Sequence, residues 1–156
     1  MRSFAMCCCV VVLAGCAKPE QQAAKDSATA SLAAGATAAP ISLATVAGKW
    51  AMRTMAATSD SVLVSYEMVA AGDPSGWTFN FPNRAPVPIR VLATQGDSIV
   101  TEAGPYESVL RKGIQVSTHS VMRLQDGKLV GTTVAHYSGG GPDSVLNLRT
   151  EGTRAP

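Results

Sequence analysis

From residue 41 onward, apolar and polar residues alternate in short runs. Every second residue is apolar in residues 62–68, 77–81 and 87–91. This period of two is typical of strands with one buried and one hydrated face. Turn residues separate the runs. The pattern predicts strands over residues 49–57, 62–70, 76–81, 87–94, 97–102, 106–111, 115–125, 128–138 and 144–151.

Many short strands joined by short turns, without a helical period of useful length, predict an all-β fold. We expect a single antiparallel meander barrel of eight to nine strands, and a β-sandwich is the alternative. The domain is predicted over residues 43–154. A segment of this length is enough for one hydrophobic core but not for two.

One hairpin can be placed in register from the sequence. Asp126 and Gly127 favour a type I′ turn, which pairs Gln125 with Lys128. Small and hydroxylated residues predominate on the face that this register turns inward, and they leave room inside the barrel. These inner residues are Thr118, Ser120, Met122, Leu124, Leu129, Gly131, Thr133 and Ala135.

The first sixteen residues have a different pattern. Arg2 precedes an uncharged, mostly apolar run of eleven residues, 4–14. This run is too short to span a bilayer as a helix and is typical of a secretory signal peptide. It ends in Leu13-Ala14-Gly15-Cys16, which resembles the lipobox of bacterial lipoproteins.

The lipoprotein resemblance implies a processing route and an address. Residues 1–15 would be removed as a type II signal peptide, and Cys16 would receive a diacylglyceryl group and an N-acyl chain such as palmitate. Several acyl chains anchor a protein stably in a bilayer. The resemblance places the protein in the cell envelope, facing the periplasm. Ala17 after the cysteine favours the outer membrane.

Residues 16–42 are predicted to be a flexible linker rich in alanine, because they contain too few large apolar side chains to form a core. Removal of residues 1–15 leaves 12 basic and 11 acidic residues, a net charge of +1. This balance does not favour nucleic acid as a partner. All four cysteines lie within the first sixteen residues, so the exported domain has no disulfide.

The triplet Gly48-Lys49-Trp50 opens the first predicted strand. A Gly-x-Trp at this place resembles the calycin group, which includes lipocalins, fatty-acid-binding proteins and avidins. The resemblance implies that Trp50 closes one end of the barrel and that a late basic residue packs over it. We assign that role to Arg149 through a cation–π contact. The alternative is that Trp50 is an ordinary core aromatic residue.

The candidate ligand-binding residues come from the predicted inner face. They are Tyr66, Met68, Phe79, Thr118, Ser120, Met122 and Thr133. His119 and His136 lie diagonally on the opposite face and are a weak metal candidate, for which the pattern supplies no third ligand. No catalytic motif is present, so we predict a non-enzymatic protein without a cofactor.

Two functions follow from these observations. The first is a lipid-anchored barrel that binds a small apolar or amphipathic molecule inside. The second is a structural or assembly lipoprotein with a filled core, which contacts other envelope proteins. Barrels of about eight strands are wide enough for side chains or for one small ligand. The choice therefore depends on the volume of the cavity.

Overall fold

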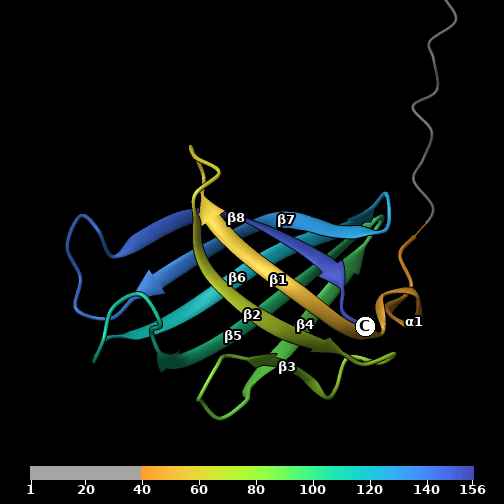
Figure 1. Ribbon diagram of the computed structural model, residues 1–156, viewed down its shortest axis with the longest axis horizontal. Helices are drawn as coiled ribbons and strands as arrows, with labels where there is room; N and C mark the ends of the chain where they lie inside the picture. Colours follow the sequence, from red (N-terminus) through yellow and green to blue (C-terminus); the bar gives the residue numbers. More distant parts are fainter. Residues whose placement is uncertain (1–39) are drawn as a thin grey trace, which may run out of the picture. The chain divides into compact units, whose positions relative to one another are not determined.

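The computed structural model describes residues 40–156, which contain one closed antiparallel barrel (Figure 1). Each strand pairs with the next along the chain, and the last pairs with the first. The strands are β1 (Gly48–Ala56), β2 (Val62–Ala70), β3 (Trp77–Asn80), β4 (Val87–Gln95), β5 (Ser98–Glu107), β6 (Gln115–Gln125), β7 (Lys128–Tyr137) and β8 (Val145–Arg154). The predicted meander barrel is confirmed, and closure of the sheet excludes a sandwich.

The signal peptide, Cys16 and the linker up to residue 39 lie outside the described residues. Ile41, which we assigned to the linker, packs against the core, and its N–H donates to the Gly96 carbonyl at 2.7 Å. The short helix α1 (Leu43–Val46) follows. Within residues 40–156, no helix has the length and apolarity needed to cross a bilayer.

β5 is one strand where the sequence predicted two. The β5–β6 ladder is irregular between Ala103 and Tyr106, so Gly104 and Pro105 have no partners in β6. A proline that needs no ladder hydrogen bond can remain within a strand at such an irregularity. Gly104 has a φ of 114°, and a Cβ there would lie 2.6 Å from the Val116 carbonyl oxygen. The turn residues therefore mark a bulge and not a strand end, which reduces nine predicted strands to eight.

The register predicted for the β6–β7 hairpin is confirmed along its whole length, from the pair Gln125–Lys128 to the pair Val116–Tyr137. Thr118, Ser120 and Thr133 are buried on the inner face as expected. His119 and His136 are exposed on the outer face. The turn chemistry of two residues therefore fixed the inward or outward direction of two complete strands.

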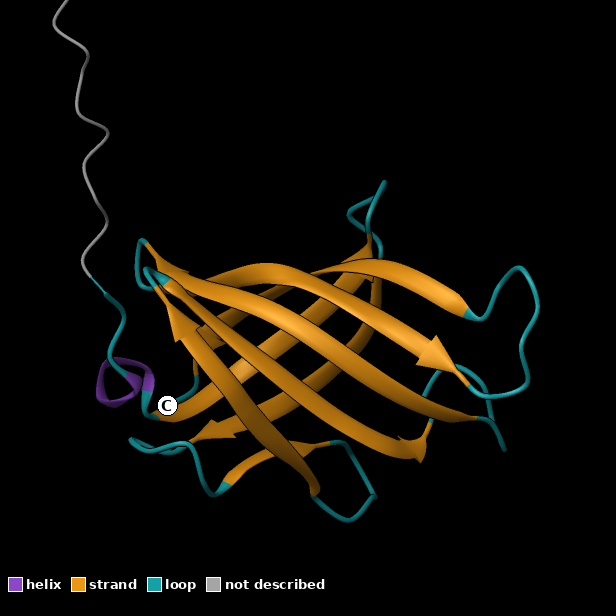
Figure 2. Cartoon of the chain, turned by 180° about the vertical axis from the view of Figure 1, so that it is seen from behind, coloured by secondary structure: helices purple, strands orange, loops and turns teal. Residues whose placement is uncertain are grey.

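The two ends of the barrel differ (Figure 2). Helix α1 and the chain's C-terminus lie at one end, which we call the closed end, together with the β2–β3, β4–β5 and β6–β7 connections. The other four connections lie at the opposite end, which we call the open end. The main core cluster fills the closed half and extends to Phe79 and Phe81. Its buried members are Val46, Trp50, Met52, Met68, Ala70, Trp77, Phe79, Phe81, Ile89, Ile99, Ala103, Met122 and Leu129.

Trp50 is the central residue of the closed end and is fully buried. Its indole N–H donates to the Val46 carbonyl at 2.8 Å, so α1 is fastened directly over the core. Gly152 lets the Met52 side chain pack closely against β8, because a Cβ there would lie 2.3 Å from the sulfur of Met52. The helix and the indole therefore cover the core at this end.

Candidate ligand pocket at the open end

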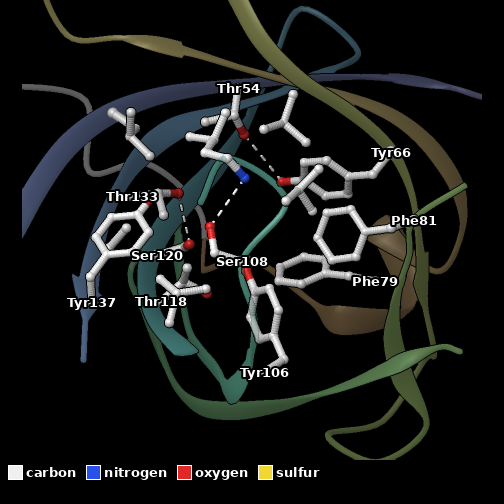
Figure 3. Close-up of a pocket in the computed structure, with 16 residues that line it drawn as sticks. Thr54, Tyr66, Phe79, Phe81, Tyr106, Ser108, Thr118, Ser120, Thr133 and Tyr137 are labelled. Carbon is white, nitrogen blue, oxygen red and sulfur yellow. Dashed lines mark hydrogen bonds between the residues drawn. The ribbon is translucent and has the colours of Figure 1, made fainter. Parts of the chain in front are cut away.

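A cavity of about 50 Å³ lies inside the barrel at its open end (Figure 3). Strands β1, β2, β3, β5, β6, β7 and β8 and two loops contribute side chains to it. The lining residues are Thr54, Val64, Tyr66, Phe79, Phe81, Tyr106, Ser108, Val109, Leu110, Val116, Thr118, Ser120, Thr133, Ala135, Tyr137 and Leu148. These residues fall into an aromatic wall and a hydroxyl wall with different chemistry.

Four rings form the aromatic wall. Tyr66 contacts Phe79 edge-on with 5.0 Å between ring centroids, and Phe81 lies 5.2 Å from Tyr66 and 5.7 Å from Tyr106. Aromatic contacts of this geometry add stability to that gained from burial of the ring surfaces. Burial raises the pKa of the Tyr66 phenol to about 12, although its contact with Thr54 opposes the rise. The phenol therefore stays neutral, and it can donate or accept a hydrogen bond at physiological pH.

The hydroxyl wall is a chain of hydrogen-bonded side chains on β6, β7, β8 and β1. Ser120 and Thr133 hydroxyl oxygens are 2.8 Å apart, and those of Thr133 and Thr150 are 2.9 Å apart. Longer contacts of 3.5 Å join Thr150 to Thr54 and Thr54 to the Tyr66 phenol. The barrel interior thus contains a connected polar network, which links the hydroxyl wall to the aromatic wall.

Thr118 differs from the other hydroxyl residues. It is buried, with 8% of its surface exposed, and its Oγ1 has no hydrogen-bond partner. The Thr118 hydroxyl lies close enough to Tyr106 to oppose the rise that burial causes in that phenol's pKa, but the two groups lack hydrogen-bond geometry. A buried hydroxyl without a hydrogen-bond partner lowers the stability of the folded state. Among the buried polar atoms of the lining side chains, the Thr118 hydroxyl is the one that lacks a partner and could bind a guest.

The β5–β6 loop forms one lip of the pocket. The buried Ser108 hydroxyl accepts hydrogen bonds from the N–H groups of Leu110 (3.1 Å) and Arg111 (3.0 Å). Arg84, from the β3–β4 loop, donates to the Glu107 carbonyl at 2.6 Å. These hydrogen bonds fix the conformation of the β5–β6 loop beside the opening of the pocket.

Five of the seven predicted ligand-binding residues line this pocket: Tyr66, Phe79, Thr118, Ser120 and Thr133. Met68 and Met122 do not, because they lie in the closed half and are 0% and 2% exposed within the core cluster. Alternation gives the face on which a side chain lies, but it does not give the depth along the barrel at which packing becomes solid.

Several lining residues were not predicted from the sequence. Thr54, Phe81 and Leu148 continue the alternation of their strands, so period two was a usable signal for them. Tyr106 was assigned to a separate short strand, and its inward direction depends on the bulge at Gly104. Ser108, Val109 and Leu110 belong to a loop, where alternation carries no information about direction.

The predicted contact between Trp50 and Arg149 is wrong. Arg154 lies over the Trp50 ring, with its guanidinium carbon 4.6 Å from the ring centroid. It also donates to the Ala47 carbonyl at 2.8 Å and to the Thr45 carbonyl at 2.6 Å. Arg149 pairs with Asp60 near the open end instead. β8 extends to Arg154, three residues beyond its predicted end, so the basic residue at the closed end is a later one.

The two histidines do not complete a metal site within the described residues. His119 lies opposite Glu102 of β5, a neighbour that the sequence analysis did not identify. The Glu102 carboxylate accepts a hydrogen bond from Arg90 at 2.9 Å and is therefore engaged. Among residues 40–156, no group of three His, Cys, Asp or Glu side chains could hold a metal ion.

The described residues define a class of protein: a closed eight-stranded meander barrel that is filled at one end and carries a small amphipathic pocket at the other. This architecture is compatible with the calycin-like barrel that Gly48 and Trp50 suggested. Comparisons of the chain with protein-family models, with curated proteins and with solved structures each gave no match.

Proposed function

We propose that the protein is a lipid-anchored envelope protein whose barrel binds a small amphipathic molecule at the open end. The observation that carries this proposal is the unpartnered Thr118 hydroxyl inside a pocket that is aromatic on one side. A guest with an apolar face and one hydroxyl or carbonyl group suits both walls. Such a guest would stack against the rings of Tyr66 and Phe81 while it hydrogen-bonds to Thr118.

The volume of the pocket limits the size of the guest. Typical ligand pockets enclose ~300–1,000 Å³, whereas this cavity has about 50 Å³. The guest is therefore either a molecule of few heavy atoms or the terminal group of a larger one. A larger molecule would extend past Val109 and Leu110, which line the cavity and are also exposed.

The anchor belongs to the same proposal. It is supported by Leu13-Ala14-Gly15-Cys16 at the end of an apolar run, where signal cleavage would occur. Acylated Cys16 would attach the barrel to a bilayer on its periplasmic side, in the outer membrane if Ala17 acts as expected. Labelling with a fatty acid tests this part, since the Cys16→Ser variant should lose the label that the parent carries.

A structural or assembly role is the second candidate, and the small cavity favours it. The closed half is solidly packed, and a modest cavity alone does not require a ligand. In this alternative the barrel serves as a rigid body whose outer face contacts other envelope proteins. The same small volume therefore supports either a small guest or no guest.

Native mass spectrometry separates the two candidates. The sample is the mature polypeptide, residues 16–156 with Cys16→Ser, expressed with export to the periplasm and purified without detergent. A co-purifying molecule that organic solvent releases supports the binding function. Repeated absence of any adduct, together with no uptake of added phenol, supports the structural role and contradicts the binding proposal.

A further inference from the structure

We propose that the open end of the barrel docks on an anionic lipid surface through the β5–β6 loop. Among residues 40–156, five of the seven exposed large hydrophobic residues lie at this end. They are Val62, Leu63, Val109, Leu110 and Val145, each 39–45% exposed. Exposed apolar residues that gather in one region mark interaction sites more often than scattered ones do.

Val109 and Leu110 follow the buried Ser108 at the start of the loop, and both are exposed. The Ser108 N–H donates to the Ile114 carbonyl at 2.8 Å and closes the base of the loop. The Arg111 guanidinium lies 4.1 Å from the centroid of the Tyr137 ring and fixes the side nearest β7. A preorganised apolar pair loses little conformational freedom when it enters a bilayer interface.

The charges of the loop indicate which surface it would meet. Arg111 and Lys112 directly follow the apolar pair, and residues 108–114 contain no carboxylate. Of the acidic residues elsewhere at this end, Asp60 is paired with Arg149, and the Glu107 carboxylate accepts a hydrogen bond from the Gly113 N–H. Asp143 in the β7–β8 loop is exposed. Apolar side chains flanked by cations favour interfaces that contain anionic headgroups.

The length of the chain permits this orientation. The described chain enters the barrel at the closed end. Docking therefore requires that the opposite, open end turns toward the membrane in which Cys16 would be anchored. Ten-residue strands span ~33 Å. The 24 residues from Cys16 to residue 40 reach at most ~80 Å when extended. This reach exceeds the length of the barrel, so an anchored chain allows the loop to contact the same bilayer.

Docking is a property of the rim and does not depend on the proposed ligand. It also suggests how the pocket would be supplied, because Val109 and Leu110 line the cavity as well as the outside of the mouth. A molecule that leaves the bilayer would pass these two side chains. Vesicle binding and pocket binding are separate measurements, so failure of one is distinguishable from failure of the other.

The test is flotation with vesicles of phosphatidylcholine, with and without phosphatidylglycerol. The sample is the mature polypeptide with Cys16→Ser, because an acylated chain would bind every vesicle. We expect binding to the anionic vesicles, and a loss on the order of tenfold or more in the Val109→Ser/Leu110→Ser double variant. Lys112→Gln should weaken binding to anionic vesicles only.

Leu92 provides the matched control. It is 47% exposed on the outer face of β4, away from the open end, so Leu92→Ser removes an equally exposed side chain. This variant should bind vesicles as the parent does. The proposal is overturned if the parent does not bind anionic vesicles, or if the double variant binds as well as the parent.

A tryptophan in the loop makes the test independent of flotation. Trp50 and Trp77 are buried at 0% and 1% exposure and give a constant background. The emission of Leu110→Trp should shift to shorter wavelength when anionic vesicles are added, because the indole enters the interface. A Leu92→Trp variant should show no shift, and equal shifts in both variants would contradict docking by the loop.

Discussion

Single side chains determine the chemistry of the pocket. Thr118 shares the inner face of β6 with Ser120, but only Ser120 has a hydrogen-bond partner. The difference arises because Thr133 lies directly opposite Ser120, whereas Thr118 faces alanine on both neighbouring strands, Ala103 on β5 and Ala135 on β7. Alanine on both sides therefore leaves the buried Thr118 hydroxyl without a partner.

Replacement of Thr118 by valine separates stability from binding. The variant keeps the shape of the side chain and removes a hydroxyl that lacks a partner, so we expect the free energy of unfolding to stay constant or rise by about 1 kcal/mol. Binding of phenol should weaken. Ser120→Ala, the control, should lose about 1 kcal/mol because it breaks the 2.8 Å contact with Thr133. Urea denaturation measures the free energy of unfolding of both variants. A large loss of stability in Thr118→Val would show that its hydroxyl has a partner.

The burial of the Tyr66 phenol predicts that the stability of the barrel depends on pH in the alkaline range. Its pKa is raised from 10.0 to about 12, chiefly because the phenol is buried. The unfolded chain therefore releases this proton at lower pH than the folded barrel does, and the free energy of unfolding falls as the pH rises from about 10 to about 12. Denaturation at several pH values should give a shallower fall for Tyr66→Phe than for the parent. Parallel curves would show that the phenol is not buried.

At the scale of elements, the turns gave the most reliable information and the strand ends the least. Asp126 and Gly127 set the register of β6 and β7, because a two-residue turn leaves no freedom in pairing. Gly104 and Pro105 were wrongly taken as the end of a strand, since the residue types that end strands also form bulges. Helix α1 was not predicted, because four residues are too few to show a period.

The same limits explain how far the site could be predicted. Residues on regular strands, such as Phe79 and Thr133, were assigned to the interior correctly. Arg149 was assigned to the wrong end, because one error in the end of β8 moves a side chain along the barrel axis. The lip also depends on the long-range hydrogen bond that Arg84 donates to the Glu107 carbonyl, for which a single sequence gives no signal.

Closure of the barrel should depend on Arg154 and not on Arg149. Arg154 bonds two carbonyl groups next to α1 and covers Trp50, so Arg154→Ala should lower the free energy of unfolding by roughly 1–2 kcal/mol. Arg149→Ala removes an ion pair with the exposed Asp60 and should cost less than about 1 kcal/mol. Chemical denaturation of the two variants side by side checks the order. A larger loss of stability in Arg149→Ala than in Arg154→Ala would contradict the role given to Arg154.

At the scale of the whole molecule, the barrel is divided into a packed half and a half with free space. Buried Ala70 lies in the packed half, near α1, and buried Ala135 lines the pocket. Both are inner residues of similar exposure, 3% and 2%. They provide a matched pair for testing where space exists inside the barrel.

Valine at each of these positions adds the same two methyl groups. In the packed half, Ala70→Val should lower the free energy of unfolding by about 1–3 kcal/mol, because there is no room for them. Ala135→Val should be neutral or stabilising, because the methyl groups enter the cavity. Thermal unfolding of the pair tests this division. Equal destabilisation would show that the open half is packed as tightly as the closed half.

Binding of phenol, with toluene as a control of nearly the same shape that lacks the hydroxyl, tests the central claim most directly. The measurement is the change in backbone amide chemical shifts of the mature polypeptide with Cys16→Ser. We predict saturable changes for phenol at residues that line the open-end cavity, weaker changes for toluene, and neither in Ala135→Val. An absence of saturable changes, or equal changes in Ala135→Val, would contradict a binding pocket in this barrel.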